Sequence, residues 1–127
     1  HGPMLAGRQP PATLPAWVSD ADLDVYAAAF GHHGFRGPLN WYRNIDRSWE
    51  LLAPWSGTRI TVPAIYLVGE RDLLLSFRGM DRLVPNLERF IPDLREKTVV
   101  PGCGHWIQRE RADLVSEALI RLARATH

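Results

Sequence analysis

The sequence is poor in cysteine, has almost no net charge and contains no long hydrophobic run. A single cysteine excludes an internal disulfide and favours a reducing compartment, so we expect a cytoplasmic protein. The net charge is +1 and basic residues are scattered among acids, which gives no electrostatic reason to expect nucleic acid or an anionic membrane as partner. No apolar run approaches the ~20 residues needed to span a bilayer, and no signal peptide is visible. These absences indicate a globular protein that binds neither nucleic acid nor membrane.

The chain is also short for a large α/β enzyme. Its 127 residues are 46% hydrophobic and 23% charged, which is an ordinary globular composition. Eight-stranded α/β folds usually need more than about 200 residues, so the length allows one domain but not a whole enzyme of that kind. The first three residues, HGP, are either an expression scar ahead of a natural start at Met4 or the continuation of a longer chain. The sequence leaves both origins open.

The first half of the chain carries two helical patterns. Ser19 is a plausible N-cap and Asp22 holds the acid of a capping box, which predicts a short amphipathic helix over residues 20–30. A second helical pattern covers residues 38–52. Aromatic residues are frequent here, and we expect Tyr26, Trp49 and Trp55 to pack in an apolar core.

The second half alternates between strand and helix patterns. The run ITVPAIYLVG at residues 60–69 is rich in β-branched residues and continuous, as in a strand that is buried on both faces of a parallel sheet. A helix over residues 80–90, a short strand over 98–100 and a helix over 109–125 follow. The sequence therefore predicts an α/β fold in which a strand-helix-strand-helix unit with parallel strands follows the first helices.

An acid and an imidazole follow the two predicted strands. Asp72 comes just after the first strand, and His105 lies in a glycine-rich loop after the second. The C-terminal ends of parallel strands share one edge of a sheet, where catalytic groups gather. A carboxylate beside an imidazole fixes its tautomer and stabilises the imidazolium, as in a catalytic triad with the chain order acid then histidine. The alternative is an aspartate that caps the next helix and an ordinary loop histidine.

Three segments carry a resemblance to soluble epoxide hydrolases. Residues 34–44, GFRGPLNWYRN, resemble the cap-domain segment of that family. Residues 69–72, GERD, resemble its acid turn, and residues 101–106, PGCGHW, followed by Gln108 resemble its histidine loop. The resemblance implies a partial α/β-hydrolase fold. Residues 1–57 would be an N-terminal arm with cap-like helices, and residues 58–127 the C-terminal βαβα portion of the core.

The resemblance also implies roles for individual residues. Tyr42 would donate a hydrogen bond to the epoxide oxygen, His105 would activate the water that hydrolyses a covalent ester, and Asp72 would orient His105. Trp41 and Trp106 would line the substrate pocket, with core packing as the alternative for each. Neither a cofactor nor a metal is implied. Cys103, close to His105, is expected to be a small buried thiol rather than a nucleophile.

Other parts of the family's machinery have no counterpart in these residues. The nucleophilic aspartate, the oxyanion-hole loop and a second cap tyrosine all precede the resembling region in the family. Loss of a nucleophile costs on the order of 10⁶-fold in rate, so we expect the chain alone to be close to inert.

Three hypotheses follow. The first is a C-terminal portion of an epoxide hydrolase that acts with an N-terminal portion. The second is a stand-alone, non-catalytic binding or oligomerising module, which pairs its exposed strand edges or exchanges its cap helices with a second copy of itself. The third is a haloalkane dehalogenase, against which Tyr42 argues because that reaction needs halide-binding donors rather than a phenol.

Overall fold

The computed structural model describes residue 7, residue 9 and residues 11–126. The alternative origins of the HGP segment and Met4 therefore concern residues outside the described part. The chain divides into two compact units, His1–Arg43 and Asn44–His127.

The first unit holds two helices, α1 (Asp20–His33) and α2 (Arg36–Arg43). The predicted capping box is present, because the Asp22 carboxylate accepts the Ser19 amide at 2.9 Å and the Ser19 hydroxyl accepts the Asp22 amide at 3.2 Å. The helix continues beyond the predicted residue 30. The expected core position of Tyr26 is wrong, since α1 has no buried residue and this side chain is half exposed.

The second unit begins with α3 (Ile45–Leu52), which passes into a 3-10 turn, η1 (Ala53–Trp55). The single helix that we predicted over residues 38–52 is thus divided between α2 and α3 at Asn44. Pro54 lies in the first turn of η1, where a missing amide hydrogen is tolerated.

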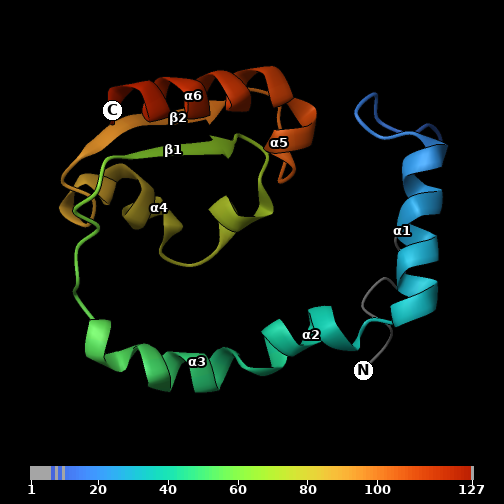
Figure 1. Cartoon of the computed structure of the whole chain (residues 1–127), viewed down its shortest axis with the longest axis horizontal. Helices are drawn as coiled ribbons and strands as arrows, with labels where there is room; N and C mark the ends of the chain where they lie inside the picture. The colour runs from blue at the N-terminus through green and yellow to red at the C-terminus, as the bar shows by residue number, and fades with distance from the viewer. Residues whose placement is uncertain (1–6, 8, 10, 127) are drawn as a thin grey trace. The chain divides into compact units, whose positions relative to one another are not determined.

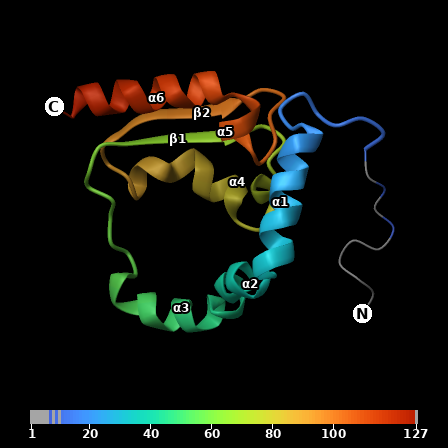
Figure 2. The same cartoon turned by 45° about the vertical axis from the view of Figure 1, so that its right-hand side comes forward.

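The rest of the second unit is a strand-helix-strand-helix arrangement around two parallel strands. In Figures 1 and 2, helix α6 runs along one face of the strand pair and α4 lies on the other face. Paired residues include Tyr66 with Lys97 and Val68 with Val99. The elements, in chain order, are β1 (Ala64–Gly69), η2 (Leu73–Ser76), α4 (Met80–Leu83), η3 (Val84–Arg89), β2 (Leu94–Val100), α5 (Ile107–Glu110) and α6 (Ala112–Ala125).

Several predicted boundaries in this unit shift. Strand β1 starts at Ala64, after Pro63, rather than at residue 60, and β2 starts at Leu94 rather than at residue 98. The predicted helix over residues 80–90 becomes a single α-turn followed by a 3-10 segment, because Pro85 has no amide hydrogen for a continuous α-helix.

The core of the described residues is small. Its buried apolar side chains come from both strands, from the loop after β2 and from the helices, and they are Val68, Leu87, Val100, Cys103 and Ala118. The expectation of a small buried thiol at Cys103 is confirmed.

The two strands differ in their charge. Strand β2, LREKTVV, carries Arg95, Glu96 and Lys97, whereas β1, AIYLVG, carries no charged residue. Charged side chains are typical of a strand at the border of a sheet, and an uncharged strand is typical of the interior. By this criterion β2 is built as a border strand and β1 as an interior one.

Strand β1 has one edge that no strand in the described part of the chain covers. The amides of Ala64 and Glu70 donate to carbonyls on the β2 side, both at 3.0 Å. Because successive amides of a strand point to opposite sides, those of Ile65, Leu67 and Gly69 point away from β2. This edge can therefore accept another strand.

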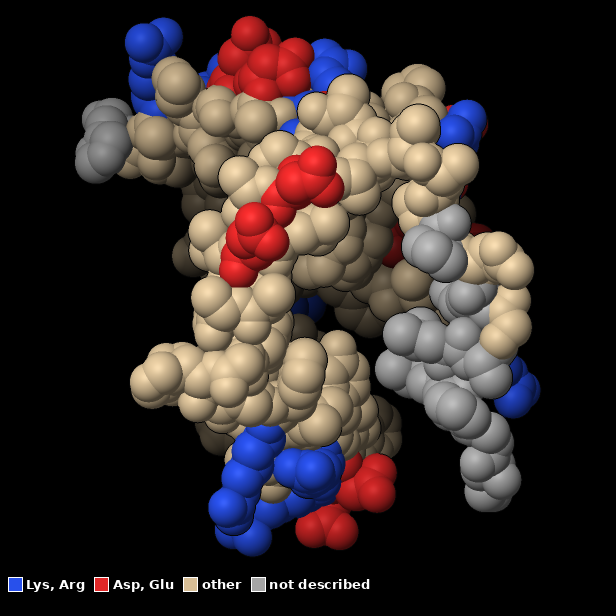
Figure 3. All heavy atoms as spheres, turned by 90° about the vertical axis from the view of Figure 1, so that its right-hand side faces the viewer, with Lys and Arg blue, Asp and Glu red and all other residues tan. Residues whose placement is uncertain are grey.

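Charged side chains are distributed in small groups of both signs. Figure 3 shows one face, on which separate small groups of basic and of acidic side chains lie on a mostly uncharged surface. Among the described residues, no helix combines the length and the apolar character needed to cross a bilayer.

Candidate acid–base site

Asp72 is the first component of the site, and the turn after β1 positions it. The Asp72 amide donates to the Gly69 carbonyl at 3.1 Å, which closes the turn. The Asp72 side chain caps η2, because its Oδ1 accepts the Leu74 amide at 2.9 Å. The residue is 9% exposed, so the carboxylate is buried and has a fixed orientation.

His105 is the second component, and it comes from the loop after β2. Its Nδ1 lies 3.1 Å from both carboxylate oxygens of Asp72. The His105 side chain is 42% exposed, whereas that of Asp72 is 8% exposed. With Nδ1 directed at the carboxylate, Nε2 is the ring atom that remains to take a proton from water. The structure thus brings together the acid and the imidazole that the sequence placed after consecutive strands.

The pKa values of two groups reflect this arrangement. Burial by itself raises the pKa of the Asp72 carboxyl, but hydrogen bonds from the Leu74 amide and from His105 hold it below its usual value. Burial, followed by the negative charge of Asp72, raises the pKa of the Tyr66 phenol. Asp72 is therefore held as a carboxylate in spite of its burial.

This lowered pKa predicts a pH dependence of stability. The unfolded carboxyl titrates near ~3.9, so the folded carboxylate stabilises the chain above that pH. The contribution is lost as the pH falls through the unfolded pKa toward the lower folded one. We expect the difference in free energy of unfolding between wild type and Asp72→Asn to shrink below about pH 4, as measured by urea unfolding.

Gly31→Ala is a suitable control for this measurement, because it removes no titratable group and its effect should not depend on pH. A difference between wild type and Asp72→Asn that stays constant over the whole range would contradict the lowered pKa.

Gly69 brings the end of β1 against the histidine loop. A Cβ atom at this position would lie far inside van der Waals contact with the carbonyl oxygens of Gly104 and Cys103. The adjacent Arg71 amide donates to the Cys103 carbonyl at 2.8 Å. The turn that carries Asp72 and the loop that carries His105 are therefore in direct backbone contact, which requires glycine at position 69.

Gly69→Ala is accordingly expected to destabilise the chain by about 2 kcal/mol or more, because backbone atoms must move to admit the methyl group. Gly31→Ala is the matched control, since a Cβ there meets nothing within 4 Å and alanine favours a helix over glycine. Urea unfolding of both variants measures the effect. Equal stability of the two variants would contradict the close contact at Gly69.

Two glutamates that the sequence analysis missed also contact the histidine loop. Glu70, at the end of β1, accepts the Gly102 amide, and Glu110, in α5, accepts the amides of Gly104 and Trp106. Both side chains accept hydrogen bonds from backbone amides. A contact with the backbone puts no requirement on the type of the partner residue, so the sequence carries no motif that would reveal it.

The remaining predicted site residues are exposed. Tyr42 and Trp41 are neighbours on α2 in the first unit and are 71% and 83% exposed. Trp106 follows His105, with the two rings edge to face and their centroids 5.2 Å apart. Its indole is half exposed, so it is available to a ligand near His105. The roles of these three residues stay predictions.

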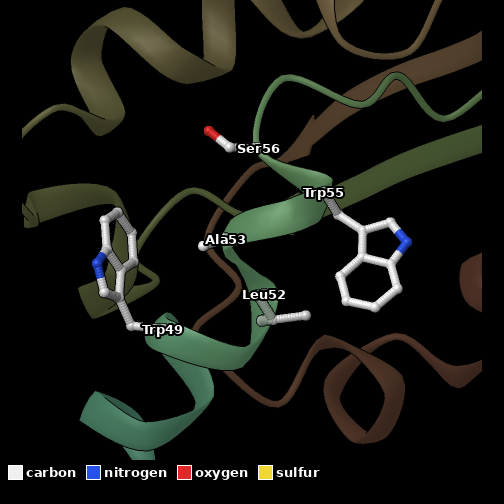
Figure 4. A pocket seen from close by; sticks show the side chains of 5 residues that line it. All are labelled: Trp49, Leu52, Ala53, Trp55 and Ser56. Carbon is white, nitrogen blue, oxygen red and sulfur yellow. The ribbon is translucent and has the colours of Figure 1, made fainter.

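A shallow hollow of about 460 Å³ lies at the end of α3 and in η1. Figure 4 shows Trp49 and Trp55 on opposite sides of this turn, with Leu52, Ala53 and Ser56 completing the lining. The expectation that Trp49 and Trp55 pack in a core is wrong, because the two residues are 81% and 62% exposed.

The described part of the chain contains no group of three or more His, Cys, Asp or Glu side chains that could hold a metal ion.

Parallel strands with an acid after one and a histidine after the next are the arrangement in which α/β hydrolases carry the last two members of their triad. Related proteins agree with this class. The chain is 40% identical over 111 residues to Epoxide hydrolase 1 of Siraitia grosvenorii. This match covers 86% of the chain and 36% of that protein. The chain is 42% identical over 110 residues to Epoxide hydrolase A of Mycobacterium tuberculosis, which covers 87% of the chain and 33% of that protein. No family model matches the chain.

Solved structures give the same result. Epoxide hydrolase I of potato (Solanum tuberosum) superposes with a TM-score of 0.82 at 34% identity, over 87% of this chain and 35% of that one. A mutant of the Vigna radiata epoxide hydrolase superposes with a TM-score of 0.86 at 32% identity, over 91% of this chain and 37% of that one. By sequence and fold, the chain corresponds to the C-terminal part of an epoxide hydrolase of the α/β-hydrolase fold.

The chain spans about one third of the length of these relatives. Its short length fits a portion of an epoxide hydrolase, and the comparisons do not favour the stand-alone module.

Proposed function

We propose that this chain supplies the acid, the base and a cap tyrosine of an epoxide hydrolase, which converts an epoxide to a vicinal diol when an N-terminal portion supplies the nucleophilic aspartate. The observation that carries the proposal is the contact of His105 Nδ1 with both oxygens of the buried Asp72, at 3.1 Å, where two parallel strands end. The relatives' names support the same reaction class.

The base step follows from this geometry. The nucleophile's carboxylate opens the epoxide and forms an ester to one of its carbons. His105 Nε2 then removes a proton from a water as the water oxygen attacks the ester carbonyl. The ester bond breaks and the departing oxygen takes a proton from the imidazolium. The second proton of the water leaves the nucleophile's carboxyl and reaches, through solvent, the alkoxide formed on ring opening, so the diol leaves with the carboxylate restored. Asp72 stabilises the imidazolium between these two proton transfers.

Tyr42 acts in the first step of this scheme. Its phenol donates a hydrogen bond to the epoxide oxygen and stabilises the alkoxide that develops as the ring opens. Trp41 and Trp106 line the pocket for the apolar part of the epoxide. The high exposure of the three side chains leaves them available to a substrate.

The partner in this proposal is the N-terminal portion of the hydrolase. Three observations support it: the uncharged, uncovered edge of β1, the exposed Trp49 and Trp55, and the one-third share of the relatives' length. A strand of the partner would extend the sheet at β1. We propose that the cap-like part ends at residue 57 and that the core portion covers residues 58–127.

The test is complementation. The chain is co-expressed with the N-terminal two thirds of a relative such as Epoxide hydrolase A, the pair is purified as the complemented enzyme, and diol formation from styrene oxide and from an aliphatic epoxide is measured. Each piece alone is the control. Diol from the complex alone supports the proposal.

Two results would contradict it. A folded complex without turnover of either epoxide would refute the assigned chemistry. A chain that forms a stable oligomer with itself and excludes the N-terminal portion would indicate the self-pairing module instead.

We also propose a cytoplasmic location, supported by the single, buried and reduced Cys103. Fractionation of the source cells followed by immunoblotting tests it, and recovery of the chain outside the cytoplasmic fraction would refute it.

A further inference from the structure

The loop that carries His105 has an unusual set of acceptors for its backbone amides. The Gly102 amide donates to Glu70 Oε2 at 2.9 Å. The Gly104 amide donates to Glu110 Oε2 at 2.8 Å, and the Trp106 amide donates to Glu110 Oε1 at 3.2 Å. Alternate amides of the loop therefore end on carboxylates rather than on carbonyls or water.

Glu110 holds the two amides that flank His105. One carboxylate oxygen accepts the amide before the histidine and the other accepts the amide after it, so both oxygens are engaged. The carboxylate also packs on Gly104, where a Cβ atom would come within 3.2 Å of Glu110 Oε1. Hydrogen bonds to an ionised acceptor are about twice as strong as neutral ones.

The loop needs this support because two glycines lie within it. Gly102 has a φ of +73°, and Gly104 is next to His105. Glycine gives the backbone more freedom than any other residue, and the freedom must be lost for His105 to remain on Asp72. The His105 side chain is 42% exposed, so packing alone does not hold it.

We propose that Glu110 is a positioning residue for His105, with Glu70 as a second anchor of the same loop. The carboxylate of Glu110 fixes the backbone on both sides of the histidine and so keeps Nδ1 on the Asp72 carboxylate. The importance of this contact for turnover rests on the function proposed above, but the contact itself does not.

A glutamine at position 110 separates this role from simple packing. It has the size of glutamate, but its carboxamide has one acceptor oxygen and can satisfy only one of the two amides. Glu50→Gln is the matched control, because Glu50 is an exposed glutamate on α3 that does not contact the loop.

The test uses nuclear magnetic resonance on the full chain, labelled with nitrogen-15. In Glu110→Gln, hydrogen exchange at the Gly104 or Trp106 amide should be faster by about ten-fold or more. The Nδ1 resonance of His105 should shift and its proton should exchange faster with water, whereas Glu50→Gln should match wild type at all three positions.

Two outcomes would overturn the proposal. The first is an unchanged exchange rate at both amides. The second is faster amide exchange with an unchanged His105 resonance, which would limit Glu110 to a structural role. A variant that unfolds is replaced by Glu110→Asp, whose shorter side chain keeps the charge but cannot reach both amides, and the same two outcomes then decide the role of Glu110.

Kinetics of the complemented enzyme distinguish this proposal from the proposed function. Glu110→Gln should lower kcat about ten-fold with little change in KM, because the substrate does not contact the glutamate. Absence of turnover in the wild-type complex would refute the function while the resonance result still decides the role of Glu110.

Discussion

Replacement of His105 by glutamine is expected to lower kcat of the complemented enzyme by about 10³-fold or more, because a general base contributes about 10²–10⁴-fold and no other imidazole is assigned to the water. The ester should form but not hydrolyse. Mass spectrometry of the N-terminal portion after mixing with an epoxide should therefore show a stable adduct of the substrate's mass, together with one turnover at most.

His33→Gln provides the matched control, since it removes an exposed imidazole at the end of α1 that lies against His32. This variant should retain the wild-type rate without an adduct. Full activity of His105→Gln would refute the assignment of the base. An inactive variant without an adduct would place His105 in the ring-opening step instead.

Asp72→Asn should give the second large effect, a fall in kcat of about 10³–10⁴-fold. The carboxamide keeps the shape of the acid and can still accept the Leu74 amide, but it directs N–H toward His105 Nδ1 and so favours the wrong tautomer. It also removes the charge that stabilises the imidazolium. Steady-state kinetics at neutral pH measure the loss, and KM should change little.

Asp81→Asn is the control, because Asp81 is an exposed acid on α4, between the two strands. This variant should leave kcat unchanged. A fall of less than ten-fold in Asp72→Asn would show that His105 works without its carboxylate. In that case another group must orient the His105 ring, and the assignment of Asp72 as the orienting acid is wrong.

The sequence predicted those parts of the fold that depend on local patterns. The Ser19 capping box and the uncharged strand that ends at Gly69 both have strong local signals. The start of β2 was missed because Arg95 and Lys97 interrupt its apolar pattern, as charges do on a border strand. The break in the helix predicted over residues 80–90 was missed because the apolar residues at helical spacing were given more importance than Pro85, which lacks an amide hydrogen.

The candidate site was predictable to the extent that topology determines it. Asp72 and His105 follow consecutive parallel strands, so the order of the strands alone predicts their proximity. The contacts of Glu110 could not, because they end on backbone amides whose direction depends on the loop conformation. The burial of Trp49 was misjudged for another reason: burial depends on what covers a side chain, and helical spacing does not contain that information.

The contrast between the two strands has a practical consequence for identifying the proposed N-terminal partner. Because Arg95, Glu96 and Lys97 place charges on β2, the sheet is expected to extend past β1. A screen of candidate polypeptides can therefore be restricted to those that expose an uncharged edge strand. Leu67→Pro, which removes an amide that points outward, would block pairing at this edge and provide a negative control for such a screen.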